Sequence, residues 1–221
     1  MRDLQAEAAA GILRAKVLGP AYQAAPVYGA NGLMRFGIAP DPQGKRGDVL
    51  RCHLRHDDPD SDRPGAKRVW AVETPDKALL GPFSVALSFL VTNFGQARDD
   101  QCIFAIGSDA ISMNVQGRAD ASGKVTQWVR LFLDSQDRQV LWEAPLYGAW
   151  VNLRIDGCIG AAGFVKVRRD GVMVADYAGP VGGAASTGVI RLGIYHWPEN
   201  NNTWDMASPD RVVWFDHPRA L

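Results

Sequence analysis

Beyond Pro20, hydrophobic and polar residues alternate along most of the chain with the two-residue period of a β-strand. The clearest case is segment 83–91, where every second residue from Phe83 to Val91 is hydrophobic. The same pattern predicts further strands at 49–55, 68–72, 102–106, 111–116, 126–133, 139–143, 149–155, 163–168, 172–177, 188–196 and 211–216. Turns rich in Gly, Asp and Pro separate these segments.

Many short strands without a second helical block predict an all-β fold, an antiparallel two-sheet β-jelly roll. The pair Asp170-Gly171 predicts a tight hairpin between two of the strands. No fixed repeat and no Pro- or Ser-rich linker divides residues 21–221, so we expect a single domain there. Its core is predicted to contain Leu50, Leu54, Phe83, Val85, Leu87, Phe89, Ile190, Leu192, Ile194 and Phe215.

Residues 1–20 follow a different period, which predicts a short amphipathic helix before the stop at Gly19-Pro20. The hydrophobic residues at helical spacing are Leu4, Ala8, Ile12 and Leu13. Two roles are open for this helix: packing on its own domain, or acting as an oligomerisation or docking element.

The composition is that of a globular protein, since 47% of the 221 residues are hydrophobic and 22% are charged. The 24 basic and 24 acidic side chains balance, which argues against a nucleic-acid partner because such binders usually carry a basic excess. No apolar run approaches the roughly 20 residues that a membrane-spanning helix needs. The cysteines (Cys52, Cys102 and Cys158) are dispersed among apolar neighbours, and we expect buried free thiols.

The N-terminus has no apolar core of the length found in secretory signals, so we expect synthesis in the cytoplasm. No motif in the sequence predicts a cofactor. The loop at 57–65 could hold a structural calcium ion, but the spacing of its carboxylates lacks the Gly and Glu of an EF-hand. Its acidic residues are Asp57, Asp58, Asp60 and Asp62, and a solvated turn is the alternative.

The segment from about Trp150 to Asp216 carries a series of motifs that resembles a known group of enzymes. The motifs are Trp150-Val151-Asn152, the strand from Gly163 to the Asp170-Gly171 turn, Val174-Ala175-Asp176-Tyr177-Ala178-Gly179-Pro180, the strand Val189–Tyr195 and Val213-Trp214-Phe215-Asp216. They resemble the C-terminal half of polysaccharide lyases with a concanavalin-like jelly roll: the heparin lyase I, alginate lyase and glucuronan lyase families. The resemblance covers roughly residues 45–218 and implies a sandwich whose cleft acts on a uronic-acid polysaccharide.

Three positions depart from the catalytic pattern of these families. Val189 stands where they usually have a catalytic Tyr, and Trp70 replaces the Glu of their R-x-E strand. The segment Phe104–Gly107, aligned with their Q-x-H strand, supplies neither Gln nor His. We therefore expect binding rather than catalysis.

Alternation nevertheless predicts a groove of basic side chains. Arg191 and Tyr195 share one face of their strand, opposite Ile190, Leu192 and Ile194. Arg51, His53 and Arg55 share the face opposite Leu50, Cys52 and Leu54. Placed side by side, the two rows would bind an acidic sugar, because Arg suits bidentate recognition of a carboxylate. The alternative for Arg51, His53 and Arg55 is a solvated outer face.

Further candidates are weaker. Asn114 and Gln116, with Ser112, alternate with hydrophobic residues and could hydrogen-bond a glycan or simply face solvent. Trp197 and Trp204 border an Asn-rich loop, where their rings could stack on sugars or pack at the loop base. His196 has the opposite parity to Tyr195 and is predicted to face inward or flank that loop.

Three functions follow from these observations. The first is non-catalytic recognition of an acidic polysaccharide. The second is β-elimination by a lyase with reassigned catalytic groups, in which His53 is the base and Tyr195 the acid. The third is a glycan-binding component of a phage-like particle, docked through the N-terminal helix, because a protein without an export signal could still leave the cell on such a particle.

Overall fold

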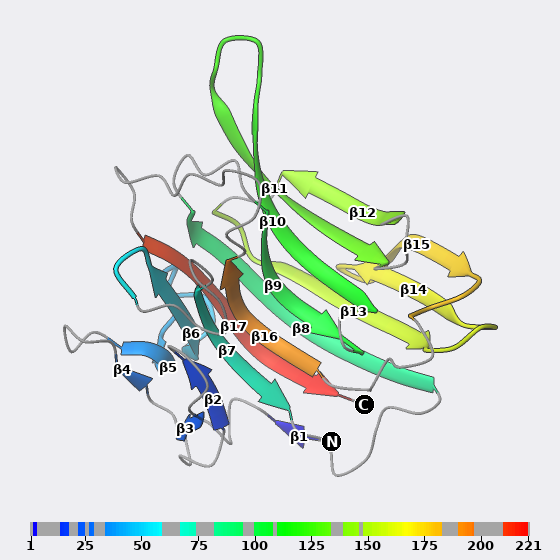
Figure 1. The fold of residues 1–221 in the computed structure, drawn as a ribbon, viewed down its shortest axis with the longest axis horizontal. Coiled ribbons are helices and arrows are strands. Elements are labelled where there is room, and N and C mark those ends of the chain that lie inside the picture. The colour runs from blue at the N-terminus through cyan, green and yellow to red at the C-terminus, as the bar shows by residue number, and fades with distance from the viewer. Residues whose placement is uncertain are drawn as a thin grey trace.

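The computed structural model shows two antiparallel β-sheets packed face to face, the predicted jelly roll (Figure 1). It describes residues 2–3, 14–17, 22–24, 27–28, 34–58, 67–73, 82–94, 100–107, 110–133, 139–145, 148–182, 190–196 and 210–220. No α-helix occurs among these residues.

The first sheet, here sheet A, has the β17 strand near its middle. Across sheet A the order is β15 (Val172–Ala178), β14 (Phe164–Arg169), β13 (Val151–Cys158), β8 (Pro82–Asn93), β17 (Asp210–Ala220), β6 (Asp48–Arg55), β5 (Met34–Pro40) and β4 (Val27–Tyr28), and β1 (Arg2–Asp3) also pairs with β17. Across the second sheet, sheet B, the order is β12 (Gln139–Pro145), β11 (Val125–Leu133), β10 (Ile111–Ala119), β9 (Asp100–Ile106), β16 (Ile190–His196), β7 (Lys67–Glu73), β2 (Arg14–Val17) and β3 (Tyr22–Ala24).

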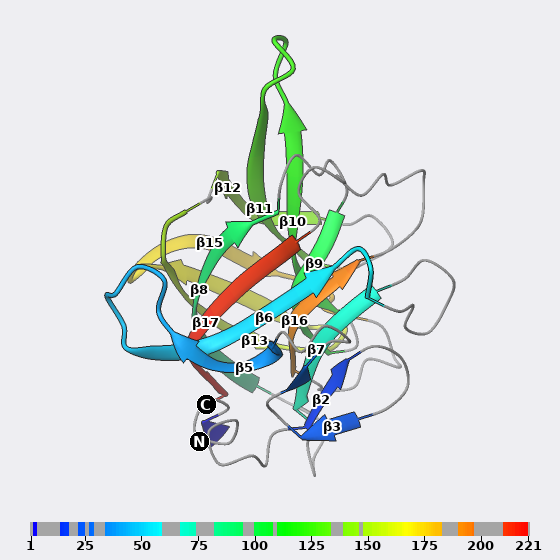
Figure 2. The same ribbon diagram turned by 90° about the vertical axis from the view of Figure 1, so that its left-hand side faces the viewer.

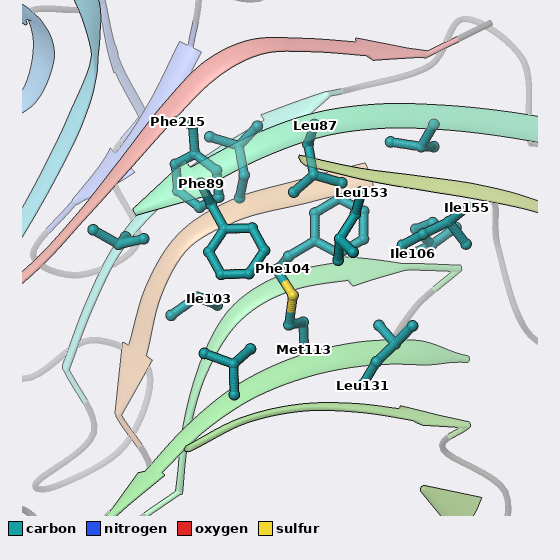
Figure 3. Packing of buried hydrophobic residues seen from close by; sticks show 14 of the residues in the cluster. Leu87, Phe89, Ile103, Phe104, Ile106, Met113, Leu131, Leu153, Ile155 and Phe215 are labelled. Atoms are coloured by element: carbon teal, nitrogen blue, oxygen red, sulfur yellow. The ribbon is translucent and has the colours of Figure 1, made fainter. Parts of the chain in front are cut away.

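The core lies between the sheets and is made by the hydrophobic positions of the alternating pattern (Figure 3). In sheet A, Leu87 and Phe89 of β8 contribute to it, and in sheet B, Met113 of β10 and Leu131 of β11 do the same. All ten predicted core residues are buried in this one cluster. The period of two thus reports correctly which side chains point inward.

All the predicted strands beyond residue 48 are confirmed, with boundaries that differ by a few residues. The predicted hairpin is also confirmed: Asp170 and Gly171 both have positive φ (50° and 84°), as a two-residue type I′ turn between β14 and β15 requires. The three cysteines are free; Cys52 and Cys102 are buried and Cys158 is partly exposed.

The N-terminal prediction needs a correction. Residues 14–17 form the strand β2, which pairs with β7, so the predicted helix does not include them. The rest of the predicted helix at 4–13 and its stop at 18–20 lie outside the described residues. The sequence pattern also missed β4 and β5, which extend sheet A beyond β6.

One hairpin reaches beyond the sandwich. Residues 117–127, at the tip of β10 and β11, pair only with each other among the described strands. The neighbouring strand β9 pairs with β10 only up to Gln116, and β12 pairs with β11 only from Trp128 onward. Figure 2 shows this tip extending past the neighbouring strands. The side chains at its base that point away from the core therefore lie at one end of that face of sheet B.

Candidate functional site

The first predicted row, Arg51, His53 and Arg55, lies on β6 and points away from the core on the outer face of sheet A. Its side chains are engaged with one another and with the start of β17. His53 Nδ1 lies 3.0 Å from Arg51 Nη2, and His53 Nε2 lies 2.7 Å from Asp210 Oδ1. Arg55 Nε donates to Asp57 Oδ1 at 2.8 Å.

The partners of His53 determine its tautomer. A guanidinium can only donate, so Nδ1 accepts from Arg51 and the proton of the neutral ring sits on Nε2, which donates to Asp210. Burial lowers the pKa of His53, partly offset by the hydrogen bond to Asp210. His53 is thus a buried, mostly neutral side chain that fastens β17 to β6.

The second predicted row, Arg191 and Tyr195, lies on β16 in sheet B. Ile190, Leu192 and Ile194 of this strand pack in the same core as Leu50, Cys52 and Leu54 of β6. The two predicted rows therefore point away from a shared core in opposite directions. The expected groove formed by both rows is wrong, and so is the expected catalytic pair of His53 with Tyr195.

Other predicted residues do join Arg191 and Tyr195. Asn114 and Gln116 project from β10 on the side of sheet B away from the core, because Met113 and Val115 beside them pack in the core. Asn114 is nevertheless fully buried, whereas Gln116 is partly exposed. Asn114 and Tyr195 are both register partners of Cys102 on β9, which lies between their strands. Their Cα atoms are therefore two strand spacings apart, roughly 10 Å.

We call these side chains, with their neighbours on β9, β11 and β12, the B face. Its described members are Cys102, Ala105, Ser112, Asn114, Gln116, Arg118, Thr126, Trp128, Arg130, Phe132, Val140, Glu143, Pro145, Arg191 and Tyr195. Among these side chains three are Arg and one is Glu, so the face is basic even though the whole chain has no net charge.

The centre of the B face is a small buried patch in which Tyr195 packs on Cys102 and Ala105. Cys102 and Ala105 are three residues apart, which ordinary alternation would place on opposite faces. The strand is irregular between them: its pairing with β10 shifts register between Met113 and Asn114. Because of this irregularity, simple alternation along β9 does not predict that Cys102 and Ala105 lie on the same face.

At the hairpin base the B face carries an ordered network of charges. Glu143 Oε2 accepts from Arg118 Nη2 at 2.6 Å and from Arg130 Nε at 3.1 Å. Arg130 Nη1 donates to Gln116 Oε1 at 3.1 Å. The hydrogen bond from Arg118 lowers the pKa of Glu143, which keeps this carboxylate ionised. Sequence reasoning singled out only Gln116 here, although the alternation along β10–β12 would have placed all four residues on one face.

Trp197, Trp204 and Val189 lie outside the described residues, as do Asp60 and Asp62 of the acidic loop. The two described carboxylates of that loop both bind arginines: Asp57 pairs with Arg55, and Asp58 with Arg35. Within the described residues no group of three or more His, Cys, Asp or Glu side chains is arranged to hold a metal ion. His196 is buried, which matches the inward-facing one of its two predicted positions.

The part of the chain that the structure describes contains no helix of the length and hydrophobicity needed to cross a membrane.

Comparisons with known proteins agree on the fold. No protein-family model and no curated protein matches the sequence. Among solved structures, an alginate lyase of polysaccharide lyase family 7 superposes with a TM-score of 0.64 at 12% identity, covering 95% of this chain and 94% of its own. An alginate lyase from Pseudomonas aeruginosa gives 0.62 at 12% identity, with 95% and 97% covered. The endo-β-1,4-glucuronan lyase from the fungus Trichoderma reesei gives 0.61 at 13% identity, with 84% and 85% covered.

These three structural neighbours are polysaccharide lyases with a jelly-roll fold, and the resemblance noted in the sequence is confirmed at the level of the fold. The fold is shared with a GH131 β-glucanase from Podospora anserina, which superposes with a TM-score of 0.53 at 12% identity, covering 84% of this chain and 78% of its own. Identities of 12–13% carry no residue-by-residue assignment of activity.

Proposed function

We propose that the B face binds an acidic polysaccharide and does not cleave it. The observation that carries this proposal is the array of Arg191, Tyr195 and Gln116, which are partly exposed on one face of sheet B, beside the buried Asn114. Arginine can pair with the carboxylates of a uronate chain, and the amide of Gln116 can hydrogen-bond its hydroxyls. The three lyases compared above are named for alginate and glucuronan, which supports an acidic glycan.

The composition of the face supports binding over catalysis. β-Elimination needs a group that neutralises the sugar carboxylate, a base for the C5 proton and an acid for the leaving oxygen. The described side chains of the B face include no His, and the sequence resemblance gives Val189 at the position of the usual catalytic Tyr. Of the base His53 and the acid Tyr195 considered from the sequence, only Tyr195 lies on this face.

Retention on an immobilised acidic polysaccharide tests the proposal. Arg191→Ala should elute at lower salt than the parent protein, because it removes a charge-assisted contact worth roughly 1.5–3 kcal/mol when well placed. Arg154→Ala is the matched control, since Arg154 is exposed on the outer face of sheet A and pairs there with Asp156. Equal elution of both variants and the parent would refute the proposal.

A second candidate is a lyase in which Tyr195 alone serves as base and then acid. It is favoured by the position of Tyr195, which is partly exposed on the same face of β16 as Arg191, a group that could neutralise a uronate carboxylate. Incubation with alginate or glucuronan would then raise the ultraviolet absorbance of unsaturated uronate, and Tyr195→Phe would lower the rate by about 10²–10⁴. We expect no such rise.

The third expectation, a component of a phage-like particle, depends on docking by the N-terminal helix. That segment falls mainly outside the described residues, and the expectation gains no support here.

A further inference from the structure

The base of the β10–β11 hairpin carries a strip of alternating aromatic and basic side chains that the proposed binding site does not use. Trp128, Arg130 and Phe132 project from β11 on the B face, because Val129 and Leu131 between them are buried in the core. Successive members are two residues apart, or roughly 6.8 Å along the strand. Trp128 and Phe132 are therefore about twice that distance apart.

Each aromatic ring of this strip supports a guanidinium group. Arg118 lies over Trp128 with 4.6 Å from Cζ to the ring centroid, and Arg130 lies over Phe132 at 4.7 Å. Stacking holds both guanidinium planes in fixed positions, so less side-chain entropy is lost when either one binds a ligand.

The two guanidinium groups share one carboxylate, that of Glu143. Arg118 binds it through both Nη atoms, at 2.6 and 3.3 Å, and Arg130 through Nε at 3.1 Å. Two positive charges face one negative charge, so the cluster keeps an excess of +1. The arrangement is a carboxylate clamp that an internal Glu occupies.

This clamp is accessible to a solute. The side chains of Arg118, Arg130 and Glu143 are 34%, 22% and 36% exposed. Ion pairs this exposed contribute little to stability, so another carboxylate can replace Glu143 at small cost. The exposed Glu143 side chain can turn to solvent, whereas the arginines are held by their aromatic neighbours.

The clamp is continuous with the proposed binding site. Arg130 is the register partner of Asn114, Asn114 pairs with Cys102, and Cys102 pairs with Tyr195. Arg130 is therefore three strand spacings from Tyr195, roughly 14 Å across the same face. A polysaccharide bound at Arg191 and Tyr195 that runs across the strands would reach the clamp with a sugar further along the chain.

We propose that Arg118 and Arg130 form a distal subsite for the carboxylate of a second uronate, with Trp128 and Phe132 holding the two guanidinium groups in place and Glu143 as the group it displaces. This inference rests on the proposed function, because it assigns a further position of the same polysaccharide site.

Calorimetric titration with oligo-uronates of different lengths tests it. The probes are trisaccharides and octasaccharides prepared from alginate and from glucuronan. The double variant Arg118→Gln/Arg130→Gln should bind octasaccharides about tenfold to hundredfold more weakly and trisaccharides as tightly as the parent. Glu143→Gln should bind octasaccharides more tightly, because it removes the competing charge, whereas a purely structural Glu143 would give no gain. Arg154→Gln on sheet A is the matched control.

The outcomes separate the two proposals. Trisaccharide binding that Arg191→Ala abolishes, together with octasaccharide binding that neither the double variant nor Glu143→Gln alters, would overturn the distal subsite alone. Absence of binding by either length to the parent protein would overturn the proposed function and the subsite together.

Discussion

A buried ion pair next to the His53 network gives the most quantitative test of the structure. Arg35 on β5 and Asp58 after β6 are 2% and 3% exposed, and Nη2 of Arg35 lies 2.8 Å from Oδ1 of Asp58. Arg35 Nε donates to the same oxygen at 3.0 Å. The other carboxylate oxygen accepts the backbone N–H of Arg55 at 2.8 Å, and Lys67 Nζ donates to the backbone carbonyl of Asp58.

Asp58→Ala should lower the free energy of unfolding by about 3–5 kcal/mol, because it leaves the guanidinium of Arg35 buried without its counter-charge. Arg35→Met/Asp58→Ala should cost far less than the sum of the two single changes, since no unpaired charge remains. Asp57→Ala is the control: its pair with Arg55 is exposed, with Asp57 at 63%, and should contribute under about 1 kcal/mol.

Urea unfolding followed by tryptophan fluorescence measures the free energies of unfolding of the parent, Asp58→Ala, Arg35→Met, the double variant and Asp57→Ala. If Asp58→Ala costs no more than Asp57→Ala, the pair is not desolvated and the reasoning fails. The same conclusion follows if the double variant is as unstable as the two single changes added together.

Two further predictions concern His53 and the packing of sheet A. A titration by NMR should find the pKa of His53 below its usual 6.5, and Asp210→Asn should lower that pKa further because a neutral amide replaces the carboxylate that stabilises the protonated ring. The pKa of His53 is lower in the folded state than in the unfolded state, so the unfolded state binds more protons below about pH 6.5. The free energy of unfolding should therefore fall as pH drops below about 6.5, by at most about 1.4 kcal/mol per pH unit. His53→Gln should abolish this pH-dependent contribution. Gly157→Ala would place a Cβ 2.5 Å from Cζ of Phe83 and 2.9 Å from the carbonyl oxygen of Phe164, so the urea midpoint should fall by the equivalent of about 1–3 kcal/mol; an unchanged midpoint would contradict this packing.

The period-two pattern predicted the strands and the core because burial between two sheets acts on every second residue. It separates inward from outward positions, but it carries no information about which sheet a strand joins. Arg51 and Arg191 were both correctly assigned to outward faces, and only the pairing of β6 with β17 and of β16 with β9 places them on opposite sides of the sandwich. Strand pairing depends on contacts between segments far apart in the chain, which local patterns do not reveal.

The candidate site was predictable only in part, for a related reason. Arg191, Tyr195, Asn114 and Gln116 lie on one face, as alternation within their own strands allowed. Cys102 was hidden by the irregularity of β9, which breaks the period at the centre of the face.

The position of β17 in sheet A has a consequence for the order of folding. Among the described strands, β17 alone joins the group β15–β14–β13–β8 to the group β6–β5–β4. A nascent chain that has reached only residue 209 would therefore expose two unpaired strand edges, on β8 and β6, which are templates for misassociation. The non-local pairing of β17 also raises the contact order, which is typical of slow folding. Sheet A can close only after residues 210–220 have been synthesised, and chaperones that cover exposed edges should raise the yield of folded protein.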